Sequence, residues 1–419
     1  MKKKLFYGWI VVIAIFLILA VGWGITFNSS SIFISPIEKD LGFTRSQMLN
    51  AVTIRGIVKT LIAFYSGWIF SKYNIKRVME ISTIVLCISY FSMSFMTSII
   101  QYYILISIQA ACIMLCGFVP LSIIINNWFF EKNAIALGFA FMRTGIGGMI
   151  FNLVGGRLIP QIGWRKTILI FATIMFVVMV ISVFFLIKVS PKDKGLEPYG
   201  NKEKNDSKKS RNNELTGIYA KDAIRTFKFW MIGIGIIIMG MNMTGLVTNI
   251  APHLSDIGYS LSTSAKVASL TMICLAFGKL LMGVLFDKYG IRNATLLTCL
   301  ALIIGVLGMI FAKYRISFVG ISVGVGLGCS FCSIALPLYA EKIYGRLDFP
   351  KILAYFQTMS NLGGIVAPLI MGAMYKSKNS YNSSLFLLLG CLIFAFFIWL
   401  KVLPKNKERS QTADSSFIA

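Results

Sequence analysis

The chain has 419 residues, of which 57% are hydrophobic and 14% are charged, and its mean hydropathy is +0.76. Soluble domains are about 45–50% apolar, so this composition excludes an ordinary soluble fold. The 41 Lys and Arg against 16 Asp and Glu give a net charge of +25, but the basic residues lie between apolar runs and form no basic domain. This pattern indicates loops that face anionic lipid headgroups, and no nucleic-acid partner.

Apolar runs long enough to cross about 30 Å of hydrocarbon occur twelve times. The first run follows Met-Lys-Lys-Lys and continues without a small-residue cleavage site, so we predict an uncleaved first span rather than a signal peptide. In chain order the predicted spans are 8–34, 47–70, 79–97, 101–126, 133–157, 166–188, 229–251, 263–286, 293–312, 316–340, 351–375 and 384–402. We therefore expect an all-α membrane protein with twelve transmembrane helices.

A long polar segment, 189–227, divides the chain into two halves of six spans each. Its Lys, Asn, Asp and Ser content is typical of a poorly ordered linker. The predicted organisation is a six-helix bundle over 1–188, this linker, a second six-helix bundle over 228–403 and a tail over 404–419. Most of the basic residues fall on the side that holds the termini and the linker. We therefore expect an inner (plasma) membrane protein whose termini and linker are cytoplasmic.

A loop motif recurs in corresponding places of the two halves. GWIFSKYNIKR (67–77) follows the second span and GVLFDKYGIR (283–292) follows the eighth. Glycine permits close helix approach, an aspartate can accept bonds from a neighbouring helix N-terminus, and the basic residues face the cytoplasm. The second copy is complete, whereas the first has Ser71 and Asn74 in place of Asp and Gly. The candidate gating residues are Gly67, Lys72, Arg77, Gly283, Asp287, Lys288, Gly290 and Arg292.

This motif and the layout of six plus six spans resemble the major facilitator superfamily. The resemblance implies two bundles related by a pseudo-twofold axis along the membrane normal, each built from three-helix repeats. Further short motifs, in order over nearly the whole chain, resemble the monocarboxylate/oxalate–formate antiporter branch. They are FYGW (6–9), LGFTRS (41–46), NWFFEK (127–132), GWR (163–165), SPKDKGLEPYG (190–200) and AIRTFKFW (223–230).

The branch resemblance also implies a substrate-binding residue in the eighth span. Its members usually carry a Gly-Arg pair four residues before the glycine of the loop motif, and that arginine is implicated in binding the substrate carboxylate. Here the matching pair is Gly278-Lys279, and lysine keeps the charge but loses the bidentate fork. Oxalate exchangers also carry a lysine within the eleventh span, where this chain has only Lys351 at the start. The resemblance therefore argues against oxalate and leaves the substrate open.

Five basic residues lie at least three residues inside the predicted spans, and no Asp or Glu lies as deep, since Glu80 is at the cytoplasmic end of its span. They are Arg55 and Lys59 in the second span, Arg143 in the fifth, and Lys266 and Lys279 in the eighth. A charge at bilayer depth costs at least about 2.5–3.5 kcal/mol, and such residues usually face a bundle interior or a watery cavity. In the fold that the resemblance implies, these spans border the interface between the halves. Lys266 is only three residues into its span, so we expect it to reach the outer surface.

We hypothesise that the other four bases create a cationic central cavity whose counter-charge is a small organic anion, a carboxylate by preference. The alternative is that these bases bond to backbone carbonyls and to Asn28, Asn152 and Asn361 for stability alone. Weaker substrate-binding candidates are polar residues on helices expected to line the cavity, each of which could equally be structural. They are Asn28, Asn242, Asn249, Tyr339 and Gln357.

These expectations describe a secondary transporter that works by alternating access, as an exchanger or a proton-coupled symporter. Exchange ranks first, because an empty cationic site is costly and no carboxylate lies in the predicted path. The alternatives are a sensor or receptor-like protein of the same fold, or an exporter of another solute class. An enzyme is not expected, since the spans hold no His, no carboxylate pair and no nucleophile–base arrangement.

The cysteines give no sign of a cofactor or a disulfide framework. All eight lie in apolar runs, and the single His253 cannot build a His site. We therefore expect no metal and no cofactor. The expected partners are the lipid bilayer and the anion, and the protein is expected to be a monomer.

Overall fold

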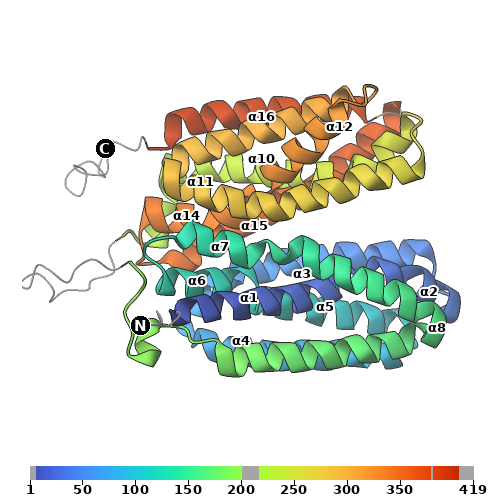
Figure 1. The fold of residues 1–419 in the computed structure, drawn as a ribbon, viewed down its shortest axis with the longest axis horizontal. Helices are drawn as coiled ribbons and strands as arrows, with labels where there is room; N and C mark the ends of the chain where they lie inside the picture. The colour runs from blue at the N-terminus through green and yellow to red at the C-terminus, as the bar shows by residue number, and fades with distance from the viewer. Residues whose placement is uncertain (1–5, 201–216, 379–380, 405–419) are drawn as a thin grey trace, which may run out of the picture.

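The computed structural model describes residues 6–200, 217–378 and 381–404, and these residues form a helical protein of two bundles (Figure 1). The central part of the predicted linker, 201–216, and nearly all of the predicted tail lie outside the described residues.

The first bundle contains six spans. Its helices are α1 (Tyr7–Trp23), α2 (Ser31–Leu41), α3 (Arg45–Lys72), α4 (Ile75–Ser92), α5 (Ile99–Leu115), α6 (Phe118–Trp128), α7 (Asn133–Phe141) and α8 (Arg143–Val180). A π-helical turn over Gly24–Asn28 joins α1 to α2 within the first span, and α5 and α6 together make the fourth. α8 holds parts of two spans, which are separated at Gly163, where φ is 80°. Only glycine adopts such a conformation at low cost.

The second bundle repeats this arrangement. Its long helices are α10 (Phe227–Asp256), α11 (Leu261–Ile310), α14 (Phe331–Tyr344), α15 (Phe349–Lys378) and α16 (Asn382–Val402). Short helices α12 (Ser317–Val319) and α13 (Gly326–Cys329), with a π-helical turn over Gly320–Val325, lead into α14 and complete the tenth span. α11 holds two spans separated at Gly290, where φ is 77°.

Eight helical stretches of the described residues are long and apolar enough to cross a membrane. Two of them, Asn133–Leu186 and Lys266–Ile310, each contain two of the predicted spans, joined at the glycine bends. α3 and α15 are the two remaining spans, and both carry polar residues that lower their hydropathy. The predicted all-α fold with twelve spans is confirmed.

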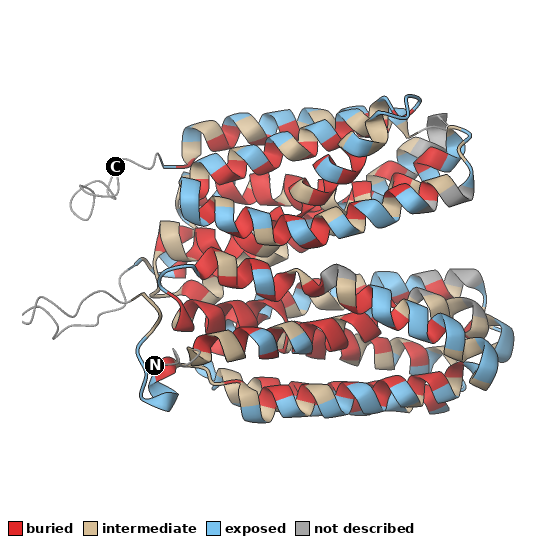
Figure 2. Cartoon of the chain, in the orientation of Figure 1, coloured by how far each residue is buried: buried red, intermediate tan, exposed pale blue. Residues whose placement is uncertain are grey.

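The outward faces of both bundles carry exposed apolar side chains, whereas the buried residues lie inside each bundle and where the bundles meet (Figure 2). Phe185 is 69% exposed, Phe394 is 57% exposed and Ile304 is 55% exposed. Large exposed apolar surfaces of this kind are costly in water and ordinary against lipid.

The starts of α1 and α10, the end of α16 and the described parts of the linker all lie at one end of the molecule, which we call the linker end (Figure 1). The linker is attached to both bundles there. Tyr199 N donates to Trp128 O at 2.8 Å, and Phe130 N donates to Tyr199 O at 3.0 Å. On the other side, Ile218 N donates to Tyr344 O at 3.0 Å and is followed by α9 (Ala220–Ala223).

The two bundles touch each other near the linker end, and two glycines permit the approach. A Cβ added at Gly67 of α3 would lie 2.6 Å from Lys351 Cα of α15. A Cβ at Gly138 of α7 would lie 2.6 Å from Lys279 O of α11. Toward the opposite end the ribbons of the bundles separate (Figure 1). The linker end is therefore the closed end of the interface between the bundles.

Valine at Gly67 is expected to prevent this closure, since its side chain would overlap the backbone of α15. Spin labels on the linker ends of α3 and α15 should then lie farther apart than in the parent protein. Gly56→Val is the matched control, because a Cβ at Gly56 of the same helix meets nothing within 4 Å. Equal label distances in the Gly67→Val variant and the control would contradict the packing described here.

Candidate functional site: a cationic surface between the bundles

Arg143 and Lys279 come together where the bundles meet. Arg143 begins α8 in the first bundle and is 6% exposed, and Lys279 lies in α11 of the second bundle and is 2% exposed. Their two charges are near enough to repel each other. Like charges held together in a buried place are unfavourable unless an anion or oriented dipoles offset them.

Arg143 is held by the backbone of another helix. Its Nη1 donates to Leu19 O of α1 at 2.5 Å, so the structural alternative, bonding to a backbone carbonyl, is realised for this atom. Its buried Nε has no hydrogen-bond partner among the described residues. A buried donor without a partner costs free energy, and an anionic oxygen could satisfy it. Arg143 thus combines a fixed position with unused donor capacity.

Arg55 and Lys59 of α3 lie against the aromatic rings of the π-helical turn and the end of α1. The Arg55 Cζ is 5.6 Å from the Phe27 ring centre, and the Lys59 Nζ is 5.6 Å from Phe27 and 6.0 Å from Trp23. Arg55 also donates to Ser30 Oγ at 3.1 Å. The Trp23 ring connects the two groups of bases, because Arg143 Cζ lies 5.7 Å from it on α8. Cation–π contacts stabilise a cation without neutralising it.

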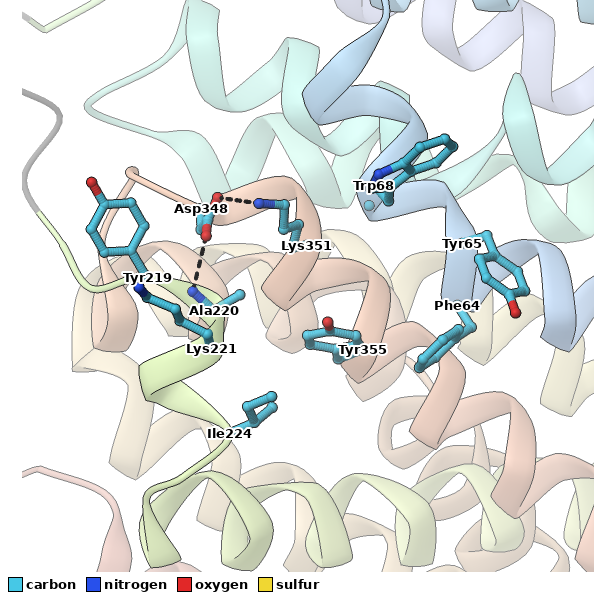
Figure 3. Close-up of a pocket in the computed structure, with 11 residues that line it drawn as sticks. Phe64, Tyr65, Trp68, Tyr219, Ala220, Lys221, Ile224, Asp348, Lys351 and Tyr355 are labelled. Carbon is cyan, nitrogen blue, oxygen red and sulfur yellow. Dashed lines mark hydrogen bonds and ion pairs between the residues drawn. The ribbon is translucent and has the colours of Figure 1, made fainter.

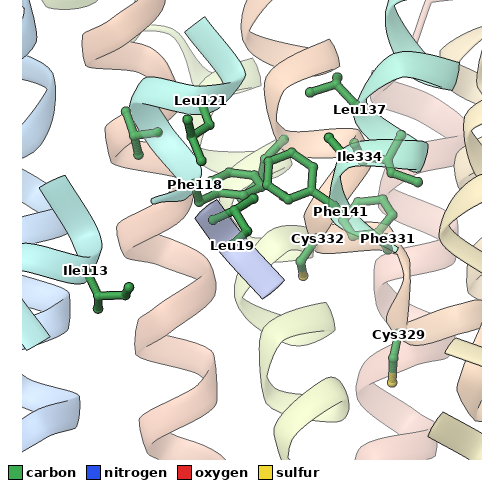
Figure 4. Close-up of a cluster of buried hydrophobic side chains, with 14 of the residues drawn as sticks. Leu19, Ile113, Phe118, Leu121, Leu137, Phe141, Cys329, Phe331, Cys332 and Ile334 are labelled. Carbon is green, nitrogen blue, oxygen red and sulfur yellow. The ribbon is translucent and has the colours of Figure 1, made fainter. Parts of the chain in front are cut away.

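A cluster of buried apolar side chains includes residues of both bundles (Figure 4). We call it the apolar layer: it combines Leu19, Phe118, Leu121, Leu137 and Phe141 of the first bundle with Phe331, Cys332 and Ile334 of the second. The Phe118 and Phe141 rings are 4.9 Å apart, and Arg143 Cζ lies 5.9 Å from Phe141. Arg143 therefore borders the apolar layer.

The other predicted substrate-binding residues lie in varied surroundings. Asn242 is fully buried in α10, where its Nδ2 donates to Ile238 O and its Oδ1 has no partner among the described residues. Asn249 Nδ2 donates to Gly245 O at 2.8 Å, and Gln357 Nε2 donates to Asn361 Oδ1 at 3.1 Å. Asn249 Nδ2 also lies 3.5 Å from Met371 Sδ of α15, whereas the bonds of Asn242 and Gln357 stay within their own helices. These contacts leave all three side chains compatible with either role.

The two remaining candidates, Asn28 and Tyr339, lie in different surroundings. Asn28 ends the π-helical turn and packs against Gly148 of α8. Tyr339 is fully buried, with its hydroxyl 2.6 Å from Thr295 Oγ1 and its ring against Phe331. Because those contacts lie inside the second bundle, we leave Tyr339 out of the site proposed below. Lys266 is exposed, as expected for a residue near the end of its span.

The complete copy of the loop motif joins the bundles. Asp287 Oδ2 accepts a bond from Ile135 N at the start of α7 at 3.1 Å, and Gly283 packs against Ala134 O. Arg292 Nη2 donates to Leu400 O of α16 at 2.7 Å. Lys288 Nζ lies 5.4 Å from the centre of the neighbouring Tyr289 ring. Asp287 thus accepts a bond from a free amide at the N-terminus of a helix in the other bundle.

The incomplete copy of the loop motif, residues 67–77, bonds mainly within its own bundle. Ser71 Oγ donates to Trp68 O of its own helix at 2.9 Å. Asn74 has φ −64° and caps α4 by accepting from Lys76 N, so no glycine is needed at this turn. Lys72 Nζ lies 5.1 Å from the Trp68 ring centre, and the Arg77 amide also donates to Asn74. Gly67 keeps a contact between the bundles in this copy.

Removing the Asp287 carboxylate is expected to destabilise the closed end, because the Ile135 amide then loses its acceptor. Losing a cap of this kind costs about 0.5–2 kcal/mol, so Asp287→Ala should lower the melting temperature of the purified protein. Ser71→Ala is the matched control at the equivalent position, where the hydroxyl bonds only within its own helix. Equal melting temperatures for the two variants would contradict a role for Asp287 between the bundles.

The structure also reveals a polar cluster that our sequence reasoning did not connect. Asn133 Nδ2 of α7 donates to Glu341 Oε2 of α14 at 2.6 Å and lies 2.8 Å from Asn126 Oδ1. Arg346 Nε donates to Glu341 Oε1 at 3.0 Å, and its Cζ lies 3.9 Å from the Phe130 ring centre. We call these five residues the Glu341 cluster. It links the bundles at the linker end.

An all-helical membrane protein with two bundles and a cationic interface belongs to the class of polytopic membrane transporters. The sequence matches the Major Facilitator Superfamily over residues 12–346, and the chain belongs to this family. The family and the relatives below are transporters, not enzymes.

Curated relatives support the predicted branch. The chain is 21% identical to Monocarboxylate transporter 10 of Homo sapiens, over 97% of this chain and 81% of that protein. It is also 21% identical to the Uncharacterized transporter ESBP6 of Saccharomyces cerevisiae, where the match covers 97% of this chain but spans only 60% of the yeast protein. The resemblance to the monocarboxylate branch is confirmed.

Solved structures show the same fold. The crystal structure of the Major Facilitator Superfamily transporter FucP in the outward conformation aligns with a TM-score of 0.73 over 94% of this chain and 98% of that chain. The sequence identity is 11%.

Proposed function

We propose that this protein is a secondary transporter that moves a small organic anion, a carboxylate by preference, across the membrane. The observation that carries the proposal is the convergence of Arg143 and Lys279 from opposite bundles, next to Arg55 and Lys59. No Asp or Glu lies in the interior of a predicted span, since Glu80 is at the end of its span. The substrate is then the simplest source of negative charge between the bundles.

The position of these bases suits alternating access, in which two bundles rock about a site between them. An anion bound by Arg143 and Lys279 would contact both bundles at once. It would offset the repulsion between the two charges and supply an acceptor for Arg143 Nε. Substrate binding would thereby favour the bundle arrangement that brings the two bases together.

We further propose that the linker end faces the cytoplasm, because most of the basic residues lie on that side of the predicted spans. The described conformation, which is closed at the linker end, would then be outward-facing. The inner (plasma) membrane location and the bundle limits 1–188 and 228–403 belong to the same proposal.

For the coupling mode we favour exchange of one anion for another. An empty site with repelling charges is costly to occlude, so the return step would proceed most readily with a second anion bound. Proton-coupled symport is the competing mode, and it would require one of the buried lysines to release its proton during the cycle.

The test is a thermal-shift screen of the purified protein against small mono- and dicarboxylates, followed by flux of the best stabiliser in proteoliposomes. We expect uptake that is accelerated by the same anion inside the vesicles. If uptake needs a proton gradient and does not depend on the anion inside the vesicles, the protein is a proton-coupled symporter and not an exchanger. Binding without flux would favour a sensor, and no stabilisation by any carboxylate would contradict the proposed substrate class.

A further inference from the structure

A cavity lies at the linker end, and its lining includes none of the bases of the cationic surface between the bundles. Its volume is about 710 Å³, and its walls come from α3 of the first bundle, from α9 of the linker and from α15 of the second bundle (Figure 3). Cavities of this size hold small molecules or parts of larger ones. The neighbouring bundle contact is the approach of Gly67 to Lys351.

One wall of this cavity is aromatic. Phe64 is 47% exposed, Tyr65 is 56% exposed and Trp68 is 52% exposed, although all three belong to a membrane-spanning helix. Tyr355 of α15 lies 5.7 Å from Phe64, ring centre to ring centre, and continues the wall. Trp and Tyr at the end of a span are typical of the lipid headgroup level. An occupant with an apolar chain would cover this surface.

The other wall is charged. Asp348 Oδ2 accepts from Ala220 N at 3.0 Å, and its Oδ1 forms an ion pair with Lys351 Nζ at 3.1 Å (Figure 3). The Lys221 Nζ lies 5.4 Å from the ring centre of Tyr219 and is exposed. This wall thus carries two lysines and one carboxylate, which is already engaged, so its net charge is positive. It is complementary to a phosphate group.

We propose that this cavity binds one anionic phospholipid of the leaflet at the linker end. The headgroup phosphate lies at Lys221 and Lys351, and an acyl chain runs along Phe64, Tyr65 and Tyr355. Basic residues near a membrane surface attract anionic lipids, and the aromatic wall gives the acyl chain an apolar contact.

Because the walls belong to both bundles, such a lipid would connect them at the closed end. A rocking movement that parts α3 from α15 would divide the binding site. The bound lipid therefore favours the conformation in which the linker end is closed, independently of which solute the protein carries.

The test uses the full chain in nanodiscs and measures its retention of phosphatidylglycerol and phosphatidylcholine by native mass spectrometry. The parent protein is expected to retain phosphatidylglycerol and not phosphatidylcholine. Lys221→Gln combined with Lys351→Gln should weaken phosphatidylglycerol binding by roughly fivefold for each lysine removed. Lys192→Gln combined with Lys194→Gln removes equal charge from the linker, outside the cavity, and should leave retention unchanged.

Lys221→Gln alone keeps the Asp348–Lys351 ion pair and decides the test if the double variant does not fold. Parent-like phosphatidylglycerol retention in a folded cavity variant would overturn the proposal. So would equal retention of phosphatidylcholine, or displacement of the lipid by inorganic phosphate, since a phosphate site needs no acyl chain.

Discussion

Lys279→Gln is expected to abolish uptake of the transported anion while the protein remains folded in the membrane. In the proposed site Lys279 supplies the charge from the second bundle, and Arg143→Gln removes the charge from the first. A hydrogen bond to a charged group contributes about 1.5–3 kcal/mol, so each variant should lose roughly 10- to 150-fold in anion affinity. The measurement is counterflow in proteoliposomes, with thermal shift as a readout of binding.

The stability of the empty protein separates a binding role for Lys279 from a purely structural one. A binding role predicts that Lys279→Gln loses the thermal stabilisation that the anion gives to the parent protein, without a large fall in the melting temperature of the unliganded protein. A structural role predicts a lower melting temperature instead.

Two further variants serve as controls. Lys279→Arg restores the charge and should keep uptake. Lys266→Gln removes an exposed charge from the same helix and should leave uptake unchanged. Normal uptake by folded Lys279→Gln and Arg143→Gln would contradict the proposed site.

Glu341→Ala is expected to open the linker end. This carboxylate receives bonds from Asn133 of the first bundle and from Arg346 of its own, and its side chain is 12% exposed. The Arg346 bond lies within the second bundle and is lost in both conformations, whereas the Asn133 bond joins the two bundles. Losing a hydrogen bond to a charged group costs about 1.5–3 kcal/mol, and the cost of losing the Asn133 bond falls on the closed conformation. We expect the open population to rise by a factor on the order of ten or more, since about 1.4 kcal/mol is tenfold.

The measurement is the labelling rate of a single cysteine at Ala354, next to Gly67 in the closed interface, in a protein whose native cysteines have been replaced. Asn133→Ala should act in the same direction. Glu80→Gln is the control, because Glu80 pairs with Lys76 at 3.7 Å within α4 and does not join the bundles. An unchanged labelling rate in Glu341→Ala would show that the cluster does not hold the linker end closed.

The spans and the buried bases could be predicted because each depends on local sequence. A run of apolar residues needs the bilayer whatever its neighbours are, and a charge within it needs a polar surrounding. Arg143 and Lys279 were therefore identified as candidates without knowledge of the helix that each one faces.

The Glu341 cluster could not be predicted in the same way. Glu341 and Asn133 are separated by 208 positions in the chain, and nothing local to either residue indicates the other. The orientation of the Tyr339 side chain could not be predicted either. Because α14 is apolar around most of its circumference, its sequence does not indicate which face packs against Thr295. Both features depend on how helices are arranged in space.

The attachment of the linker at both sides has a consequence for how the polypeptide could be divided. Tyr199 is tied to Trp128 and Phe130, and Ile218 is tied to Tyr344, so each bundle holds its own side of the linker by main-chain bonds. Two separately expressed fragments, one ending at residue 200 and the other beginning at residue 217, would each keep these bonds. We expect the contacts of Gly67, Gly138 and Glu341 to reunite the two fragments once both are in the same bilayer.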